Sequence, residues 1–293
     1  MTHVGRRDEA LTRARAHCDG GAFESALARR VAMPTESQNP ERAAILEAYL
    51  VEEMEPAFAR LGFGCVRLEE RGWPFLLAER MEDPDLPTVL AYGHGDVIRG
   101  LEDQWQEGLS PWRLERRQER WYGRGTADNK GQHAVALGAL EAVIATRGRL
   151  GFNMRFLVEM GEEMGSPGLR ELCAGSASLR DCDLLLASDG PRLTAERPTL
   201  FLGSRGCLNF DLTIEAREGG HHSGNWGGLL SDPAIQLAHA LASICGSTGQ
   251  IRVPEWVPPS LPAPVRRVLA DCRLDPGPSG PAIDVSWGEP GLT

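Results

Sequence analysis

The sequence predicts an α/β fold, with a mainly parallel sheet and flanking helices, followed by a partial α+β unit. Three observations support this prediction. Short apolar runs of strand length alternate with segments whose apolar residues have helical spacing. Several of these runs stop at a glycine next to an acidic residue, as strands do where they end at the rim of an open sheet. From Thr199 onward, alternating and proline-rich sequence replaces the continuous apolar runs, which indicates a separate unit.

Composition and charge exclude several classes of protein. The chain has 293 residues, of which 42% are hydrophobic and 25% charged, ordinary values for a globular protein. Its 31 basic and 41 acidic residues give a formal charge of −10, so we expect no binding to nucleic acid or to anionic membranes. No stretch approaches the ~20 apolar residues of a membrane span, and the polar N-terminus does not resemble a signal peptide. Seven scattered cysteines without a C-x-x-C pair fit reduced thiols, so we expect a cytoplasmic location.

The first 80 residues are expected to form two helices and two strands. Apolar spacing predicts one helix over residues 9–17 and another over residues 37–61 or 40–61. Glycines at 62 and 64 end the second helix. The apolar stretches over residues 65–68 and 74–80 then predict a pair of strands that leads into the centre of the sheet.

The central stretch is VLAYGHGD, residues 89–96, an apolar run that ends abruptly in a glycine-rich loop. It predicts a buried strand that presents His94 and Asp96 at its end. In extended chain these two residues point to the same side, so the carboxylate can orient the imidazole. The alternative interpretation is a core histidine next to a loop aspartate.

Further acidic residues follow other predicted elements. Asp128 stands in GRGTADNKG, directly before a predicted helix over residues 132–146, and the order G-x-x-x-x-G-K-[ST] of a phosphate-binding loop is absent. A predicted strand over residues 153–160 leads to Glu162 and Glu163. For these two residues a solvated surface loop is the alternative interpretation.

One more strand completes the predicted sheet. The run over residues 183–187 predicts a buried strand, and Asp189 follows it. One imidazole and several carboxylates at one edge of a sheet predict a site for divalent metal, with zinc favoured by the mixed nitrogen and oxygen ligands.

The remaining chain is expected to form a second unit. Alternating residues over 207–215 predict a half-exposed strand, GGHHSG follows, and a helix is predicted over residues 232–245 with Pro233 in its first turn. We therefore expect a metal-binding unit over residues 1–204 and a partial α+β unit over residues 205–293.

Five motifs in order make the chain resemble the M20 family of di-zinc metallopeptidases. They are GHGDV, GRGTADNKGQ, EEMGS, ASDG and HHSG, and they span roughly residues 85–230. The resemblance implies that residues 1–204 form a zinc-peptidase-like catalytic domain, incomplete at its C-terminal return, with two Zn²⁺ ions, Co²⁺ or Mn²⁺ being alternatives. It also implies that residues 205–293 form a partial lid or dimerisation domain. The implied metal ligands are His94, Asp128 as the bridge between both ions, Glu163 on the second ion and Asp189 on the first.

The resemblance also implies the catalytic residues. Asp96 is expected to hold His94, and Glu162 is expected to be the general base that takes a proton from the shared water. His222 is expected to reach across a homodimer, formed through the lid domain, and to stabilise the oxyanion. In this family the bridging aspartate precedes a cis peptide bond, so we expect one between Asp128 and Asn129.

The implied function is zinc-dependent hydrolysis of peptide or amide bonds. Aspartate at position 189 favours a dipeptidase or an aminopeptidase-type enzyme acting on small peptides. The alternatives are a deacylase or desuccinylase acting on N-acyl amino acids, and a non-catalytic degenerate member of the family.

One ligand of the family pattern has no counterpart in this sequence. The family places a further metal-binding histidine near its C-terminus, and none of the seven histidines here takes that place, His133 being expected to be an ordinary helix residue. We therefore expect a C-terminally truncated fragment that binds metal weakly and has little or no activity.

Overall fold

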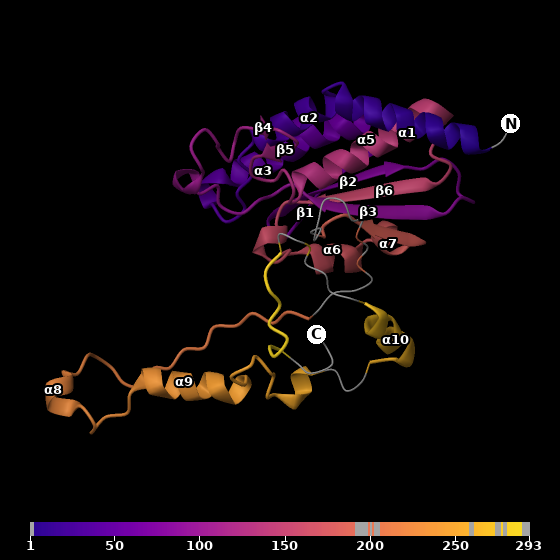
Figure 1. Ribbon diagram of the computed structural model, residues 1–293. Helices are drawn as coiled ribbons and strands as arrows, with labels where there is room; N and C mark the ends of the chain where they lie inside the picture. Colours follow the sequence, from indigo (N-terminus) through magenta and orange to yellow (C-terminus); the bar gives the residue numbers. More distant parts are fainter. Residues whose placement is uncertain are drawn as a thin grey trace. The chain divides into compact units, whose positions relative to one another are not determined.

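The computed structural model of the chain describes residues 3–190, 199, 201, 206–257, 261–272, 277 and 280–288. The chain forms two compact units, Met1–Pro191 and Arg192–Thr293, which we describe separately (Figure 1). The predicted boundary between residues 204 and 205 lies within residues 202–205, which are outside this description. The assignment of the two domains stays a prediction.

A five-stranded mixed sheet forms the centre of the first unit. The strand order is β1-β2-β6-β3-β7. Strand β3 runs parallel to both β6 and β7, whereas β2 runs antiparallel to β1 and β6. The strands are β1 (Gly64–Glu70), β2 (Trp73–Arg80), β3 (Thr88–His94), β6 (Asn153–Glu159) and β7 (Leu184–Ala187), and a separate hairpin is made by β4 (Glu115–Arg117) and β5 (Arg120–Tyr122). Three of the five strands are thus mutually parallel, and they are the three that lead to the predicted site.

Helices cover both faces of this sheet (Figure 1). Alternate residues of β2 enter two separate apolar clusters: Leu76 packs with Tyr49 and Leu137, whereas Phe75 packs with Leu179 on the other face. Because both faces are buried, the strand is continuously apolar. The helices are α1 (His3–Asp19), α2 (Ala22–Val31), α3 (Ala43–Tyr49), α4 (Glu55–Arg60), α5 (Lys130–Arg147), α6 (Leu169–Gly175) and α7 (Ala177–Arg180), and the 3₁₀ turns of this unit are η1 (Pro40–Arg42), η3 (Glu102–Gln104) and η4 (Glu162–Met164).

The N-terminal segment contains more helices than we predicted. Helix α2 was not expected, although Phe23, Leu27 and Val31 recur at intervals of four and are buried together. The helix predicted to run to residue 61 is interrupted by a π-helical turn over Leu50–Met54. Pro56 lies just beyond that turn, and because proline lacks an N–H it cannot make the regular helical bond.

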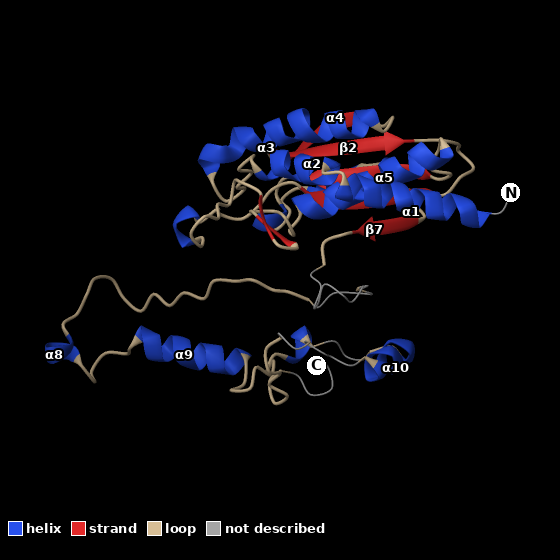
Figure 2. Cartoon of the chain, turned by 45° about the horizontal axis from the view of Figure 1, so that its top comes forward, coloured by secondary structure: helices blue, strands red, loops and turns tan. Residues whose placement is uncertain are grey.

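Strand β7 is exposed, contrary to the prediction of a buried strand. Leu184, Leu185 and Leu186 are 56%, 60% and 54% exposed. The strand pairs with β3 along one edge and is the outermost strand of the described sheet (Figure 2). Its composition fits a strand with both faces covered, but no element of the described residues supplies that cover.

In the part of the second unit that the structure describes, the regular elements are helices. This unit contains α8 (Ser223–Trp226), α9 (Pro233–Ile244), α10 (Ala263–Asp271) and the 3₁₀ turn η5 (Pro254–Trp256). The predicted helix over 232–245 is confirmed as α9, and the Asp232 side chain caps it by accepting hydrogen bonds from the N–H groups of Ala234 and Ile235. The strand predicted over residues 207–215 is wrong, because that segment pairs with no described residue.

Candidate metal centre

The predicted site residues of the first unit lie at one edge of the sheet. His94 is the last residue of β3, Glu162 opens η4 three residues after β6, and Asp189 follows β7. Asp128 comes two residues before α5. Because β3, β6 and β7 are parallel, their carboxyl ends meet at the same edge, and this brings together residues that are far apart in the sequence.

The imidazole of His94 is the centre of this cluster and is fully buried. Its Nε2 lies 2.9 Å from Asp128 Oδ1, 3.7 Å from Asp189 Oδ1 and 3.9 Å from Glu162 Oε2. Burial alone would lower the pKa of His94, but the surrounding carboxylates outweigh it and raise the pKa to about 12. The cluster therefore strongly favours a positive charge at this position.

Asp96 links His94 to the turn that carries the two glutamates. Its Oδ1 lies 3.3 Å from Nδ1 of His94, and both groups are fully buried. The same carboxylate accepts the backbone N–H groups of Glu162 at 3.2 Å and Glu163 at 3.1 Å. A carboxylate on Nδ1 fixes the imidazole so that Nε2 faces the cluster. The sequence predicted the contact with His94 but not the one with the turn.

The two glutamates differ in their relation to the cluster. Burial raises the pKa of Glu162, and the charges of Asp189 and Asp96 add to this against the opposite effect of His94. Burial and then the charge of Asp128 raise the pKa of Glu163 to about 7. Glu163 is nevertheless not part of the group that brings its ligand atoms within 4.8 Å of one another, which among the described residues consists of His94, Asp128 and Asp189. Its role as a ligand of a second metal stays a prediction.

Asn129 is a residue of this site that we did not predict. It is fully buried, and the bond between Asp128 and Asn129 is cis, as expected. Its Nδ2 donates to the carbonyl oxygen of Ser188 at 2.8 Å and to Oδ1 of Asp189 at 2.7 Å, while its Oδ1 accepts the backbone N–H of His94 at 3.3 Å. We expected only the cis bond at this position, and no local pattern indicated that the side chain would contact the site.

Lys130 and His133 lie beneath the site and do not face it as ligands. The buried ammonium of Lys130 donates to the carbonyl oxygens of Arg30 at 2.9 Å and Met33 at 2.7 Å, and burial lowers its pKa to about 7. His133 is buried on α5 with its Nε2 2.7 Å from the hydroxyl of Tyr49. Lys130 thus fastens the start of α5 to the end of α2, and its ammonium does not face outward to bind a phosphate.

Close packing explains the glycine after His94. A Cβ at Gly95 would lie 2.5 Å from Cε1 of Tyr49 and 2.7 Å from Sδ of Met160. Any larger residue would therefore displace the strand end that carries His94 and Asp96.

His222 belongs to the second unit and is exposed. It is the N-cap of α8, where its Nδ1 accepts the backbone N–H of Gly224 at 3.0 Å. Its action at the site stays a prediction.

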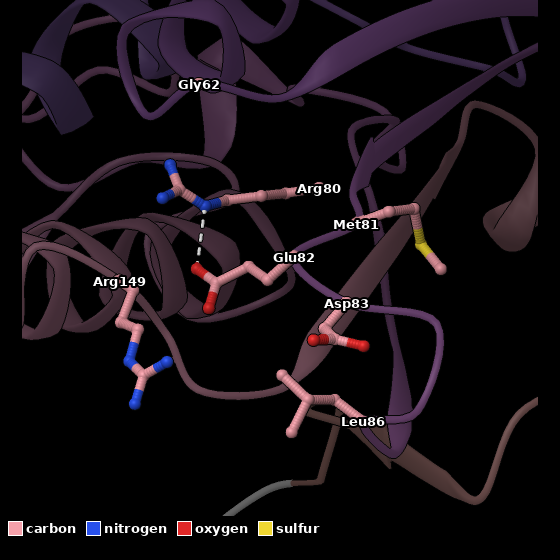
Figure 3. Close-up of a pocket in the computed structure, with 7 residues that line it drawn as sticks. All are labelled: Gly62, Arg80, Met81, Glu82, Asp83, Leu86 and Arg149. Carbon is pink, nitrogen blue, oxygen red and sulfur yellow. Dashed lines mark hydrogen bonds and ion pairs between the residues drawn. The ribbon is translucent and has the colours of Figure 1, made fainter.

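A second polar cluster lies at the opposite end of the strands. Arg80 pairs with Met154 at the start of β6, whereas His94 pairs with Glu159 at its end. A cavity of about 460 Å³ opens there (Figure 3). It is lined by Gly62, Arg80, Met81, Glu82, Asp83, Leu86 and Arg149.

Comparison with known proteins agrees with the geometry. The model of peptidase family M20/M25/M40 matches residues 90–285. The chain belongs to this family. The resemblance inferred from the five motifs is therefore confirmed.

Two curated relatives of this M20 chain are dipeptidases. Beta-Ala-His dipeptidase of Mus musculus is 35% identical over 184 residues, which cover 62% of this chain and 37% of the relative. Cys-Gly metallodipeptidase of Candida albicans is 31% identical over 251 residues, which cover 79% of this chain and 51% of the relative. The chain thus spans between about a third and a half of the length of these relatives.

A solved structure confirms the predicted α/β fold of the M20 chain. Human carnosine dipeptidase 1 matches with a TM-score of 0.70 and 27% identity, over 92% of this chain and 59% of that one. The di-peptidase Dug1p of Saccharomyces cerevisiae has the same fold, with a TM-score of 0.70.

Membership of the M20 family implies a divalent metal, and the residues present fit one. His94, Asp128 and Asp189 offer an imidazole nitrogen and carboxylate oxygens close together, in a cluster that favours positive charge. In the part of the chain that the structure describes, no helix is both long and apolar enough to cross a membrane. The cytoplasmic location stays a prediction.

Proposed function

We propose that this chain carries the catalytic site of a zinc-dependent dipeptidase. The observation that supports the proposal is the group of His94, Asp128 and Asp189 at the end of three parallel strands. Mixed nitrogen and oxygen ligands favour Zn²⁺, with Co²⁺ and Mn²⁺ as alternatives. Divalent ions in such a site polarise a substrate carbonyl and make a nearby water more acidic.

A second cation is proposed to lie between Asp128 and Glu163. The pKa of Glu163 is raised to about 7 by burial and by the charge of Asp128. A positive charge between the two carboxylates would remove this repulsion and stabilise both in the ionised form. Asp128 would then be shared by both ions.

Glu162 is proposed to move the proton of the reaction. Its carboxylate stands at the rim of the cluster, 3.9 Å from Nε2 of His94. Burial raises its pKa, which brings the carboxyl group closer to the range where it can both accept and release a proton. Glu162 would take a proton from the attacking water and return it to the leaving amine. Asp96 would keep the base and His94 in fixed relation, since it bonds to both.

His222 is proposed to stabilise the oxyanion from a partner subunit, in a homodimer formed through the second unit. Its Nδ1 accepts a hydrogen bond from Gly224. In a neutral imidazole the proton is then on Nε2, which is the donor that an oxyanion needs.

The proposed substrates are dipeptides with a free amino terminus. The support comes from the relatives, which are named for the hydrolysis of Beta-Ala-His and Cys-Gly. Aspartate at position 189 agrees with this choice and does not favour the N-acyl alternative.

The test combines metal analysis with two substrates. Because one metal-binding histidine of the family pattern has no counterpart here, we expect the purified chain to bind Zn²⁺ weakly and to turn over slowly. Cys-Gly should still be hydrolysed faster than an N-acetyl amino acid, and this activity should be lost in a chelator and restored by zinc. Glu162→Gln should lower kcat by about 10²–10⁴-fold, because it removes the group that carries the proton. Zinc should stay bound, because Glu162 is not a proposed ligand of the first ion. Glu171→Gln is the matched control, since Glu171 makes a surface ion pair with Arg71. Absence of bound zinc, or unchanged turnover in Glu162→Gln, would contradict the proposal.

A further inference from the structure

We infer that Asn129 is a positioning residue that sets the cation affinity of the site by fixing the carboxylate of Asp189 relative to His94. This inference rests on the proposed metal site and adds to it a residue that is not itself a ligand.

Asn129 lies at the start of α5 but does not cap the helix with its side chain. It occupies the N-cap position of α5, where asparagine normally accepts a hydrogen bond from the first turn of the helix. Here its side chain makes no such bond. The amide is directed to the ends of two strands instead, so its contribution is to the site and not to the helix.

The bonds of the amide are specific for asparagine. Both N–H groups of Nδ2 have acceptors, the carbonyl of Ser188 and Oδ1 of Asp189, while Oδ1 has a donor, the backbone N–H of His94. An aspartate would present an oxygen to two acceptors, and a hydrophobic residue of similar size would satisfy none of the three groups. The backbone at Gly93 permits this approach, since a Cβ there would lie 3.0 Å from Oδ1 of Asn129.

Asp189 needs this support more than the other residues of the group. Pairing between β3 and β7 ends at Tyr92 and Ala187, two residues before Asp189. Strand β7 is itself half exposed, whereas Asn129 is fully buried at the start of α5. In the described structure the amide therefore connects the carboxylate of Asp189 to the buried part of the domain. Residues that orient ligands in this way typically change metal affinity by about 10–100-fold.

The test is a double-mutant cycle on cation affinity. Co²⁺ is titrated into the full chain, and binding is followed by its visible absorption and by calorimetry. The variants are Asn129→Leu, Asp189→Ala and the double variant. Because Asn129 acts through Asp189, we expect Asn129→Leu to weaken Co²⁺ binding by about 10–100-fold and to alter the absorption spectrum, but to change affinity by less than about 3-fold when Asp189 is already alanine.

Two controls separate positioning from stability. Gln132→Ala removes the hydrogen bond that Gln132 accepts from the Ser188 hydroxyl at 2.9 Å, and so perturbs the same loop without touching Asp189. It should leave Co²⁺ affinity unchanged. Asn129→Ser replaces Asn129→Leu if the leucine variant does not fold, as judged by the thermal melting of the metal-free proteins.

The outcomes separate the role of Asn129 from the proposed metal site itself. An equal loss of affinity from Asn129→Leu with and without Asp189 would overturn the inference, as would an unchanged affinity and spectrum in the single variant. Failure of the unmodified chain to bind Co²⁺ at all would contradict the proposed function, and the inference with it.

Discussion

The two ends of the central sheet carry charged clusters of opposite character. At the far end, Glu82 accepts the backbone N–H groups of Leu150 at 2.6 Å and Gly151 at 2.8 Å and pairs with Arg80 at 3.2 Å (Figure 3). Burial would raise the pKa of Glu82, but these donors outweigh it and lower the pKa. At the His94 end, the pKa values of Glu162 and Glu163 are both raised.

The difference distinguishes a structural cluster from a functional one. The far end also contains Asn153, whose side chain donates to the carbonyls of Asp83 and Leu86 and accepts the N–H of Glu82, so the turn is held by internal hydrogen bonds. At the His94 end the carboxylates outnumber the cations among the described residues, and a bound cation would balance them. A surplus of carboxylates over cations at a strand end indicates function better than charge alone does.

The largest effect should follow from breaking the link between His94 and the glutamate turn. Asp96→Asn keeps the shape of the side chain but removes the negative charge beside Nδ1 of His94. The amide has only one oxygen, so it can no longer accept the backbone N–H groups of Glu162 and Glu163 with one oxygen each. We expect Zn²⁺ affinity to fall by about 10–100-fold, measured by calorimetry. Asp83→Asn makes the same change at the far end and should leave the affinity as it is. A similar loss in both variants would mean that the two ends do not differ.

The converse change should affect stability and not metal binding. Glu82→Gln removes a carboxylate that accepts two backbone N–H groups and pairs with Arg80. We expect the free energy of unfolding, measured by urea denaturation, to fall by about 1–3 kcal/mol, with Zn²⁺ affinity unchanged. Weaker zinc binding in this variant would show that the far end influences the site.

The smallest effect concerns the pH dependence of the metal-free protein. The pKa of Glu163 is raised to about 7, above its value in the unfolded chain. The folded state thus binds the proton more tightly, and stability contributed by this group is present at low pH and is lost as the pH rises towards 7. Glu163→Gln should therefore melt a few degrees higher than the unmodified protein at pH 8 in chelator, and the difference should be smaller at pH 5. Equal melting temperatures at pH 8 would show that burial and the neighbouring carboxylates do not destabilise ionised Glu163.

The sequence was sufficient to predict the strand ends and the acids that follow them. His94 and Asp96 stand next to glycines after an apolar run, whereas Asp128 lies in a glycine-rich motif directly before a predicted helix, and these local patterns indicated where each would lie. The parallel direction of three strands then brought the residues together. The same local reasoning failed for Asn129, because an asparagine before a helix is expected to be a cap and its partners lie 35 and 60 residues away.

The exposure of β7, the conformation of residues 207–215 and the burial of Lys130 could not be predicted, because each depends on which other segments pack against it. The apolar composition of β7 indicates a preference for burial but does not specify whether another element covers it. Residues 207–215 alternate as a strand does, yet an isolated segment has no ladder to join. Burial of Lys130 was equally hidden, since a lysine next to a glycine usually indicates an exposed loop.

The position of Asp96 has a consequence for how this protein tolerates changes in length. Its two oxygens bind consecutive amides, those of Glu162 and Glu163, while one of them also reaches His94. One added or deleted residue between positions 161 and 163 would shift those amides out of register and move the base away from the histidine. The spacing of that turn is therefore expected to be invariant in any evolved or engineered version that keeps the chemistry.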